Sequence, residues 1–280
     1  MKRSTLVPGA AVVPLVIALV ATVGASARPQ ADTIQVRTLM NAAQEVPAPT
    51  GEVSGARGTF TATVTKSDSG ASISWELSFS GLTGNAVAAH IHQAATGSPG
   101  PVVLALCGPC QSPLTGTGNL TQAALDALEA GNAYVNVHTP TNAPGEIRGQ
   151  LSSTAAVSTT LNAQQERPRP KGNARRATGT FTATVTKLGT TGRITWRLRF
   201  SGTTGRVTAA HIHIAPRGRP GPVAVALCGP CRSGVRGTAN LTSAVLAALE
   251  AGRAYVNIHT PRNPAGEIRG QIRAVPLSIS

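Results

Sequence analysis

Apolar and polar residues alternate along several short segments of the chain, and Gly-containing turns separate these segments. Residues 73–79 read Ile-Ser-Trp-Glu-Leu-Ser-Phe, and residues 60–66 alternate in the same way. A period of two is typical of a strand with one face in a core. Residues 121–131 instead combine an initial Thr, helix-forming residues and a final Gly, which predicts one short helix.

This pattern of strands and helix occurs twice in the chain, at an offset of 121 residues. The segment Phe-Thr-Ala-Thr-Val-Thr-Lys at residues 60–66 returns unchanged at residues 181–187, and the offset holds without a gap from about residue 40 to 151. A period this long indicates a duplicated domain rather than a solenoid repeat. In both copies an Asn-Leu-Thr sequon precedes the predicted helix, where the Thr is expected to be the helix N-cap.

The duplication predicts two tandem domains, over residues 34–152 and 155–274. We expect each of them to be an all-β domain, a Greek-key β-sandwich or barrel with one short helix. Residues 152–156, which read Ser-Ser-Thr-Ala-Ala, are expected to form a short linker between the domains.

The N-terminal residues have the composition of a targeting segment. Lys2 and Arg3 precede a mostly apolar run over residues 6–23, and Ala-Ser-Ala follows at residues 25–27. This order predicts a signal peptide over residues 1–27 and a secreted protein, periplasmic or extracellular. An uncleaved membrane anchor is the alternative for this run. No membrane span is expected after the signal peptide is removed.

Histidine is confined to two equivalent triads. His90 and His92 are two apart on a predicted strand, so their rings share one face, and His138 ends another strand. Three imidazoles could form an open copper or zinc site. A buried polar network, in which the rings bond to polar side chains or backbone, is the alternative. The second copy has the same pattern in His211, His213 and His259.

A hairpin pairing His138 with Glu146 would place further polar side chains on the same face as the histidines. Glu146 would then be a ligand or a partner of the ligands, and Asn136 and Arg148 would lie beside it. The corresponding residues of the second copy are Glu267, Asn257 and Arg269.

The four cysteines form two Cys-Gly-Pro-Cys motifs. In a thioredoxin-type redox site such a motif starts a helix within a βαβ unit, whereas here it follows an apolar strand. We expect two local disulfides, typical of an exported protein, with a redox site or a Cys-plus-His zinc site as alternatives. The expected disulfide cysteines are Cys107, Cys110, Cys228 and Cys231.

Charge distinguishes the two halves, although charged residues are only 13% of the chain. Residues 28–152 hold five Arg or Lys and eight Asp or Glu, whereas residues 153–280 hold eighteen and three. A basic domain can bind a polyanion, such as a cell-envelope polysaccharide or anionic lipid, or can dock onto an acidic partner. Sequence-specific nucleic-acid recognition is not expected, because exposed aromatic residues are lacking. The candidate polyanion residues are Arg167, Arg169, Lys171, Arg175, Arg176, Arg197 and Arg199.

Five motifs together resemble the CHRD domain, a module of chordin and of many exported bacterial proteins. They are Ala-His-Ile-His, Gly-Pro-Val, Leu-Cys-x-x-Cys, Tyr-Val-Asn-x-His-Thr and Gly-Glu-Ile-Arg-Gly-Gln. The resemblance implies an extracellular all-β module without an established catalytic activity. A weaker likeness, through the His-x-His strand pair, is to copper/zinc superoxide dismutase, a Greek-key barrel.

We therefore expect an exported, non-catalytic binding module for an extracellular ligand or a cell-envelope polyanion. The alternative is a copper or zinc protein that uses one three-histidine site per domain, and a dismutase-like activity is the only enzymatic candidate.

Overall fold

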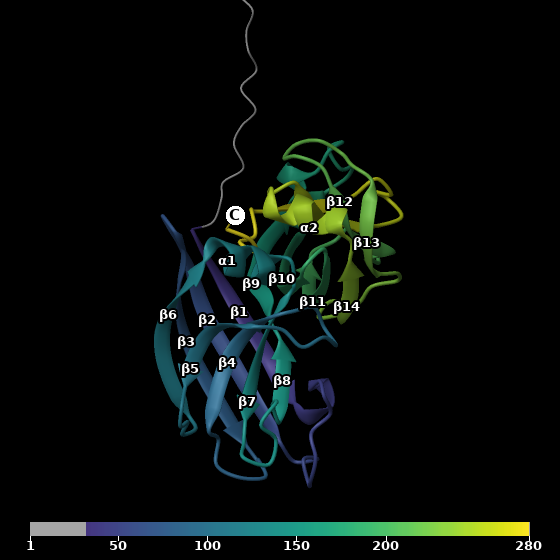
Figure 1. The fold of residues 1–280 in the computed structure, drawn as a ribbon. Coiled ribbons are helices and arrows are strands. Elements are labelled where there is room, and N and C mark those ends of the chain that lie inside the picture. The colour runs from purple at the N-terminus through teal and green to yellow at the C-terminus, as the bar shows by residue number, and fades with distance from the viewer. Residues whose placement is uncertain (1–31, 280) are drawn as a thin grey trace, which may run out of the picture.

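The structure is a computed structural model that describes residues 32–279, and the predicted signal peptide therefore lies outside the described residues. Within this range the chain forms sixteen strands and two α-helices, divided between two similar β-sandwiches (Figure 1). The all-β prediction with one short helix per domain is confirmed. Neither helix of residues 32–279 has the length and apolar character needed to cross a membrane.

Domain one contains eight strands, one 3-10 turn and helix α1. In chain order they are β1 (Thr33–Asn41), η1 (Ala42–Gln44), β2 (Arg57–Ser67), β3 (Gly70–Ser80), β4 (Ala88–Gln93), β5 (Val102–Cys107), β6 (Leu114–Thr121), α1 (Gln122–Glu129), β7 (Ala133–His138) and β8 (Ile147–Gln150).

Domain two repeats this order and adds a second 3-10 turn. Its elements are β9 (Ser152–Asn162), η2 (Ala163–Gln165), η3 (Ala174–Arg176), β10 (Thr178–Leu188), β11 (Thr191–Ser201), β12 (Ala209–Ile214), β13 (Val223–Cys228), β14 (Arg236–Leu241), α2 (Ser243–Glu250), β15 (Ala254–His259) and β16 (Ile268–Ile272).

Each domain consists of two antiparallel four-stranded sheets that are joined at one corner. In domain one the first sheet has the order β1-β2-β3-β6 and the second has the order β8-β7-β4-β5. The single pair Asn41↔Arg148 joins them. In domain two the sheets are β9-β10-β11-β14 and β16-β15-β12-β13, joined by Asn162↔Arg269.

The alternating positions fill the core between the two sheets. Ile73, Trp75 and Leu77 of β3 are at most 5% exposed, while the intervening Ser and Glu side chains face solvent. Strand β7 differs, because all six of its residues are buried. The polar face of β7 is therefore covered by the rest of domain one. This covered face carries Tyr134, Asn136 and His138.

The two short helices begin where the sequence predicts. Thr121 Oγ1 accepts a hydrogen bond from Ala124 N at 3.2 Å, and Thr242 Oγ1 accepts one from Val245 N at 3.4 Å. Both Thr residues are therefore helix N-caps, which supply an acceptor to an otherwise unpaired amide.

The expected linker is part of a strand. Residues 152–156 begin β9, and the pairs Gln35↔Thr154, Val36↔Ser153 and Arg37↔Ser152 join β9 to β1. The prediction of a linker was wrong because Ser, Thr and Ala also fit a strand that buries alternate residues; Ala155 is 8% exposed. The domains are thus connected by β-sheet hydrogen bonds.

The C-terminal segment also crosses the junction. Leu277 packs in the core of domain two and Ile279 in the core of domain one, each fully buried. Ser153 Oγ donates a hydrogen bond to Leu277 O at 2.8 Å, and Ile279 N donates one to Glu129 Oε1 at 2.6 Å. This segment therefore fixes the two sandwiches to each other.

Candidate metal centre

The histidines of each triad meet on neighbouring strands of the second sheet. Strand β4 carries His90 and His92, and its antiparallel neighbour β7 carries His138, with His90 opposite Asn136 in the register. One nitrogen from each ring lies within 4.8 Å of the other two. The same grouping occurs on β12 and β15 with His211, His213 and His259.

Backbone carbonyls fix the orientation of two rings in each triad. His92 Nδ1 lies 2.8 Å from Gly100 O, and His138 Nδ1 lies 2.9 Å from Ala143 O. A carbonyl only accepts hydrogen bonds, so each Nδ1 carries the proton and each Nε2 presents a lone pair. His92 Nε2 is buried and has no hydrogen-bond partner among residues 32–279. The equivalent bonds of domain two join His213 Nδ1 to Gly221 O and His259 Nδ1 to Pro264 O, both at 2.9 Å.

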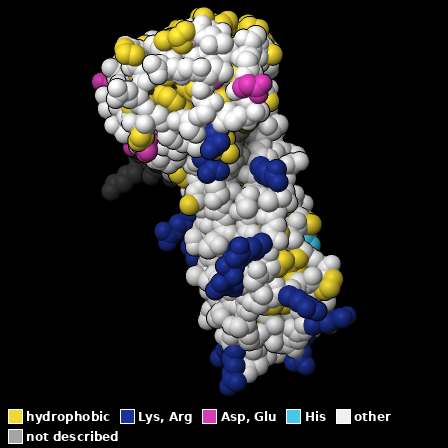
Figure 2. Space-filling model, turned by 90° about the horizontal axis from the view of Figure 1, so that it is seen from below, with side chains coloured by type: hydrophobic (Ala, Val, Ile, Leu, Met, Phe, Trp, Pro, Cys, Tyr) yellow, Lys and Arg dark blue, Asp and Glu magenta, His cyan; other side chains and the backbone are white. Residues whose placement is uncertain are grey.

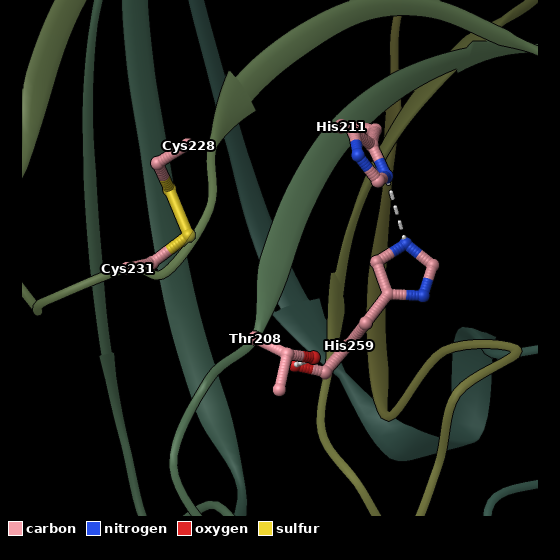
Figure 3. Close-up of a disulfide and its surroundings, with 5 residues drawn as sticks. All are labelled: Thr208, His211, Cys228, Cys231 and His259. Carbon is pink, nitrogen blue, oxygen red and sulfur yellow. Dashed lines mark hydrogen bonds between the residues drawn. A yellow bond between two sulfur atoms is a disulfide. The ribbon is translucent and has the colours of Figure 1, made fainter.

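The third ring closes the group. His90 Nδ1 lies 3.0 Å from His138 Nε2, and His211 Nδ1 lies 3.1 Å from His259 Nε2, an arrangement that Figure 3 shows directly. This spacing fits a hydrogen bond between two neutral rings. It also fits two ligands of one ion, since metal–nitrogen bonds of about 2.0–2.1 Å at angles of about 90–110° place the nitrogens about 2.8–3.4 Å apart.

The electrostatic setting keeps the rings neutral. Burial lowers the pKa of His90, His92 and His138 below the ordinary value of 6.5. For His90 the neighbouring rings of the triad add to this effect, and for His92 the charge of Arg148 does. A neutral imidazole is the form of histidine that can bind a metal.

A stack of Arg148 and Tyr134 holds His92 in place. The Tyr134 and His92 rings are nearly parallel, at 11° with centroids 4.9 Å apart, and Arg148 Cζ lies 3.4 Å from the Tyr134 centroid. Arg148 also donates hydrogen bonds to Ser98 O at 2.9 Å and to Ala95 O at 3.1 Å. Arg148 therefore fixes the loop whose Gly100 carbonyl orients His92. Domain two has the same stack in Arg269, Tyr255 and His213.

Asn136 lies on the same face of β7, between Tyr134 and His138. It is 1% exposed, and its Nδ2 donates a hydrogen bond to Pro144 O at 3.2 Å. Its Oδ1 is buried and without a hydrogen-bond partner in the part of the chain that the structure describes, as is Oδ1 of Asn257. Each site thus has two buried acceptors to offer, the ring nitrogen of His92 or His213 and this amide oxygen.

Glu146, expected next to the triad, is bonded elsewhere. Its Oε1 accepts a hydrogen bond from Thr83 N at 2.7 Å, and its Oε2 accepts from Thr139 Oγ1 at 2.6 Å and from Asn142 Nδ2 at 3.0 Å. These donors, rather than a histidine ring, occupy the carboxylate. Glu146 therefore organises the loop after β7, and Glu267 does the same in domain two through Thr204, Thr260 and Asn263.

Glu45 is a buried acid near the site that sequence reasoning missed. Its side chain is 5% exposed, and burial raises its pKa above 4.5. At Gly145, where φ is +142°, a Cβ would lie 2.4 Å from Glu45 Oε2 and 2.6 Å from Asn136 Nδ2. Only glycine lets these groups approach. A repeated motif could have pointed to this acid, because residues 41–45 read Asn-Ala-Ala-Gln-Glu and residues 162–166 read Asn-Ala-Gln-Gln-Glu. The second copy places Glu166 against Gly266 in the same way.

The cysteines form two disulfides, as expected. Cys107 is bonded to Cys110 with sulfurs 2.02 Å apart, and Cys228 to Cys231 at 2.09 Å. Figure 3 shows the second disulfide on the far side of the strands from the His211–His259 pair. The sulfurs are therefore not ligands of the histidine site, and disulfides of this kind indicate an oxidising compartment.

The basic candidates of domain two lie in two separate regions. Arg197 and Arg199 are on β11. The other five lie in the segment between η2 and β10, which includes η3, and all are exposed; these are Arg167, Arg169, Lys171, Arg175 and Arg176. Figure 2 shows dark-blue side chains spread over one domain and magenta ones on the other. On the face that Figure 2 shows, the charge contrast of the sequence is therefore also a contrast between the two surfaces.

A scan against protein-family models matches the chain twice. The matched model is the CHRD domain, over residues 36–151 and 157–272, which is most of the chain. No curated protein and no solved structure matches this sequence. The two matches coincide with the two sandwiches and each includes one complete histidine triad, and the chain therefore belongs to the CHRD domain family, of which it carries two copies in tandem.

Proposed function

We propose that this protein is an exported metal-binding module that holds one copper or zinc ion at the histidine triad of each domain. The observation that carries the proposal is the pair of Nδ1–H bonds to backbone carbonyls in each triad. Such bonds are how proteins set the tautomer and direction of a metal-binding histidine. They leave the Nε2 atoms of His92 and His138 unprotonated on neighbouring strands, with His138 Nε2 3.0 Å from His90 Nδ1.

The available ligands narrow the class of metal. The disulfides hold the sulfurs, and Glu146 and Glu267 are bound by hydroxyl and amide donors, so three neutral imidazoles form the set. Imidazole suits copper and zinc better than magnesium or calcium, and copper(II) precedes zinc(II) in the usual order of affinity. Three protein ligands leave a position for a small exchangeable ligand.

A purely structural network would also contain neutral, hydrogen-bonded histidines. The buried Nε2 of His92 and of His213 argues for the metal, because neither atom has a partner among residues 32–279. A buried acceptor without a donor costs about 1–3 kcal/mol, a cost that a bound metal ion at this nitrogen would offset.

The test is metal stoichiometry, measured by elemental analysis after dialysis and by calorimetric titration with Cu²⁺ or Zn²⁺. We expect two ions per chain in the protein, one in His138→Ala or His259→Ala, and none in the double variant. Gln93→Ala, at the exposed end of β4, is the matched control and retains two. Less than one ion per chain at micromolar metal, or two ions in the double variant, refutes the proposal.

A second activity is proposed for domain two, the binding of polyanions. The supporting observation is that its three acids are used internally. Glu166 and Glu267 are at most 1% exposed, and Glu250 forms an ion pair with Lys187 at 2.9 Å. The surface cations of this domain therefore have no acid of the same domain available to neutralise them, which gives a positive field at its surface.

A further inference from the structure

Four arginines gather on the outer face of the first sheet of domain two. Along β11, Arg193, Arg197 and Arg199 alternate with residues of the core. On the edge strand β14, Arg236 lies directly opposite Arg197 in the antiparallel register. We call this set, Arg193, Arg197, Arg199 and Arg236, the arginine face.

The arginine face is a cluster of like charges. Residues two apart on a strand are about 6.6–6.8 Å apart and neighbouring strands about 4.7–4.9 Å, so the four side chains cover a strip about 20 Å long. Arg193 Nη2 donates a hydrogen bond to Thr238 Oγ1 at 3.2 Å, and Arg197 Nε is buried without a partner among the described residues. In residues 32–279 the ion pair Lys187–Glu250 is the only one, so no carboxylate balances this strip.

The surroundings of the four arginines are rich in hydroxyl groups. The outward positions of β10 are threonines, among them the exposed Thr180 and Thr182, which lie opposite Arg199 and Arg197. The aromatic residue of β11, Trp196, points into the core and is 5% exposed. Hydroxyls can bond to sugar hydroxyls, whereas a nucleic acid strand is held by stacking on aromatic side chains.

We propose that the arginine face binds an anionic polysaccharide that lies along β11. This rests on the polyanion binding proposed above and gives it a place and a ligand class. A strip of this length spans several charged groups of an extended chain. The guanidinium groups would pair with sulfates or carboxylates of the sugar, since the planar fork of arginine matches both kinds of group.

Domain one provides a natural comparison on the same scaffold. The positions equivalent to Arg193, Arg197, Arg199 and Arg236 are Ser72, Glu76, Ser78 and Thr115. Ser72, Glu76 and Thr115 are exposed, on the corresponding sheet. The scaffold therefore tolerates Ser, Glu and Thr at these sites, and replacing the arginines by short polar residues leaves the core of domain two intact.

The experiment compares two variants of the full chain by titration with heparin, the probe for a sulfated polysaccharide. In the face variant, Arg193, Arg197 and Arg199 become Ser and Arg236 becomes Thr. In the loop variant, Arg167, Arg169, Arg175 and Arg176 become Ser, which removes the same charge elsewhere. We expect the face variant to bind at least tenfold more weakly, with a salt dependence of log K less steep by about 3–4. The loop variant should change affinity less than threefold.

Each other outcome has a distinct meaning. Failure of the unmodified protein to bind heparin at 50 mM salt would overturn the proposed polyanion binding itself. Binding that the loop variant loses and the face variant keeps, or that both lose equally, would leave polyanion binding standing and overturn the arginine face. Single-stranded DNA that competes as well as heparin would overturn the choice of a polysaccharide. Unchanged Trp fluorescence and melting temperature would show that both variants are folded.

Discussion

The buried carboxylate of Glu146 provides a sharp test of how the loop beside the histidines is held. We consider Glu146→Gln, which keeps the shape of the side chain and removes its charge. The side chain is fully buried, and its two oxygens accept hydrogen bonds from Thr83, Thr139 and Asn142. Three of these four bonds are accepted by Oε2. An amide NH₂ group at that position would face three donors, so the orientation that keeps an oxygen there is the more favourable one.

The cost of the substitution follows from these donors. The introduced amide keeps the three bonds at the Oε2 position if its oxygen lies there. Its NH₂ group then takes the Oε1 position, where it faces Thr83 N, another donor. One buried bond to a charged acceptor, worth about 1.5–3 kcal/mol, is lost, and a buried donor is left unpaired. We expect the free energy of unfolding to fall by about 3–4 kcal/mol, which lies in the upper range for a single substitution.

The assay is equilibrium urea unfolding at pH 7, followed by tryptophan fluorescence. Glu76→Gln, on the exposed face of β3 in the same domain, is the matched control and should change stability by about 0.5 kcal/mol or less. A loss below about 1 kcal/mol in Glu146→Gln would refute the reasoning, because it would mean that the neutral amide satisfies the same donors.

The pH dependence gives a second check on Glu146. Burial raises the pKa of the carboxyl, but the hydrogen bonds from Thr139, Thr83 and Asn142 outweigh burial, and the pKa lies below 4.5. A lowered folded-state pKa means that the stabilisation is complete above about pH 4.5 and is lost as the pH falls through the folded-state value. The difference between the protein and Glu146→Gln should therefore shrink below pH 4.5. A difference that stays constant down to pH 2 would contradict this assignment.

Three further predictions concern the surroundings of the site and the domain junction. Gly145→Ala should cost about 2 kcal/mol or more in urea unfolding, because its Cβ would meet Glu45 Oε2 at 2.4 Å; Gly97→Ala, also at positive φ but with nothing within 4 Å, should cost about 1 kcal/mol. Tyr134→Phe keeps the stack on His92 and loses the hydrogen bond that the hydroxyl accepts from Gly100 N, so it should weaken metal binding less than Tyr134→Leu. Tyr134→Leu also removes the stack and should weaken metal affinity about tenfold or more in calorimetric titration. Deleting residues 275–280 removes Val275, Leu277 and Ile279 from the two cores. This should lower the free energy of unfolding by about 4.5–6 kcal/mol, at about 1.5–2 kcal/mol per side chain, measured as a lower urea midpoint.

The alternation of the sequence was enough to place the histidines, because a strand leaves no choice about which residues share a face. His90 and His92 are two apart, and Val135 and Val137 had to face the core, which put His138 on the other side. The pairing of β7 with β8 also follows from polarity, since the register that matches Val137 with Ile147 also matches Asn136 with Arg148. Period and polarity thus determined most of the site.

The partners of the polar residues could not be predicted in the same way. Glu146 is bonded to Thr83, which is 63 residues away and lies outside any strand. A periodic pattern tells which side a residue faces, but it does not tell which loop covers that side. For the same reason the sequence did not reveal that the loop containing Ala95 and Ser98 accepts the bonds of Arg148. Loop conformations depend on contacts that no short-range pattern encodes.

The two copies have diverged in their cores and outer surfaces but not in the histidine site. Buried residues have changed between equivalent positions, from Met40 to Leu161 and from Val137 to Ile258, although all four are at most 2% exposed. Packing alone therefore tolerates substitution on this scaffold. The residues of the site are identical in both copies, namely the three histidines and the Tyr, Asn, Glu and Arg that surround them.

This contrast bears on how the two proposed activities are divided. The identity of the histidines and their polar neighbours in both copies is what a shared metal site requires. The structural network around Glu146 is retained equally, in Glu267 and its partners. The outer sheet face, where Ser72 and Glu76 correspond to Arg193 and Arg197, has instead changed its charge. Metal binding is thus the activity that both domains would share, and polysaccharide binding is one that domain two alone would add.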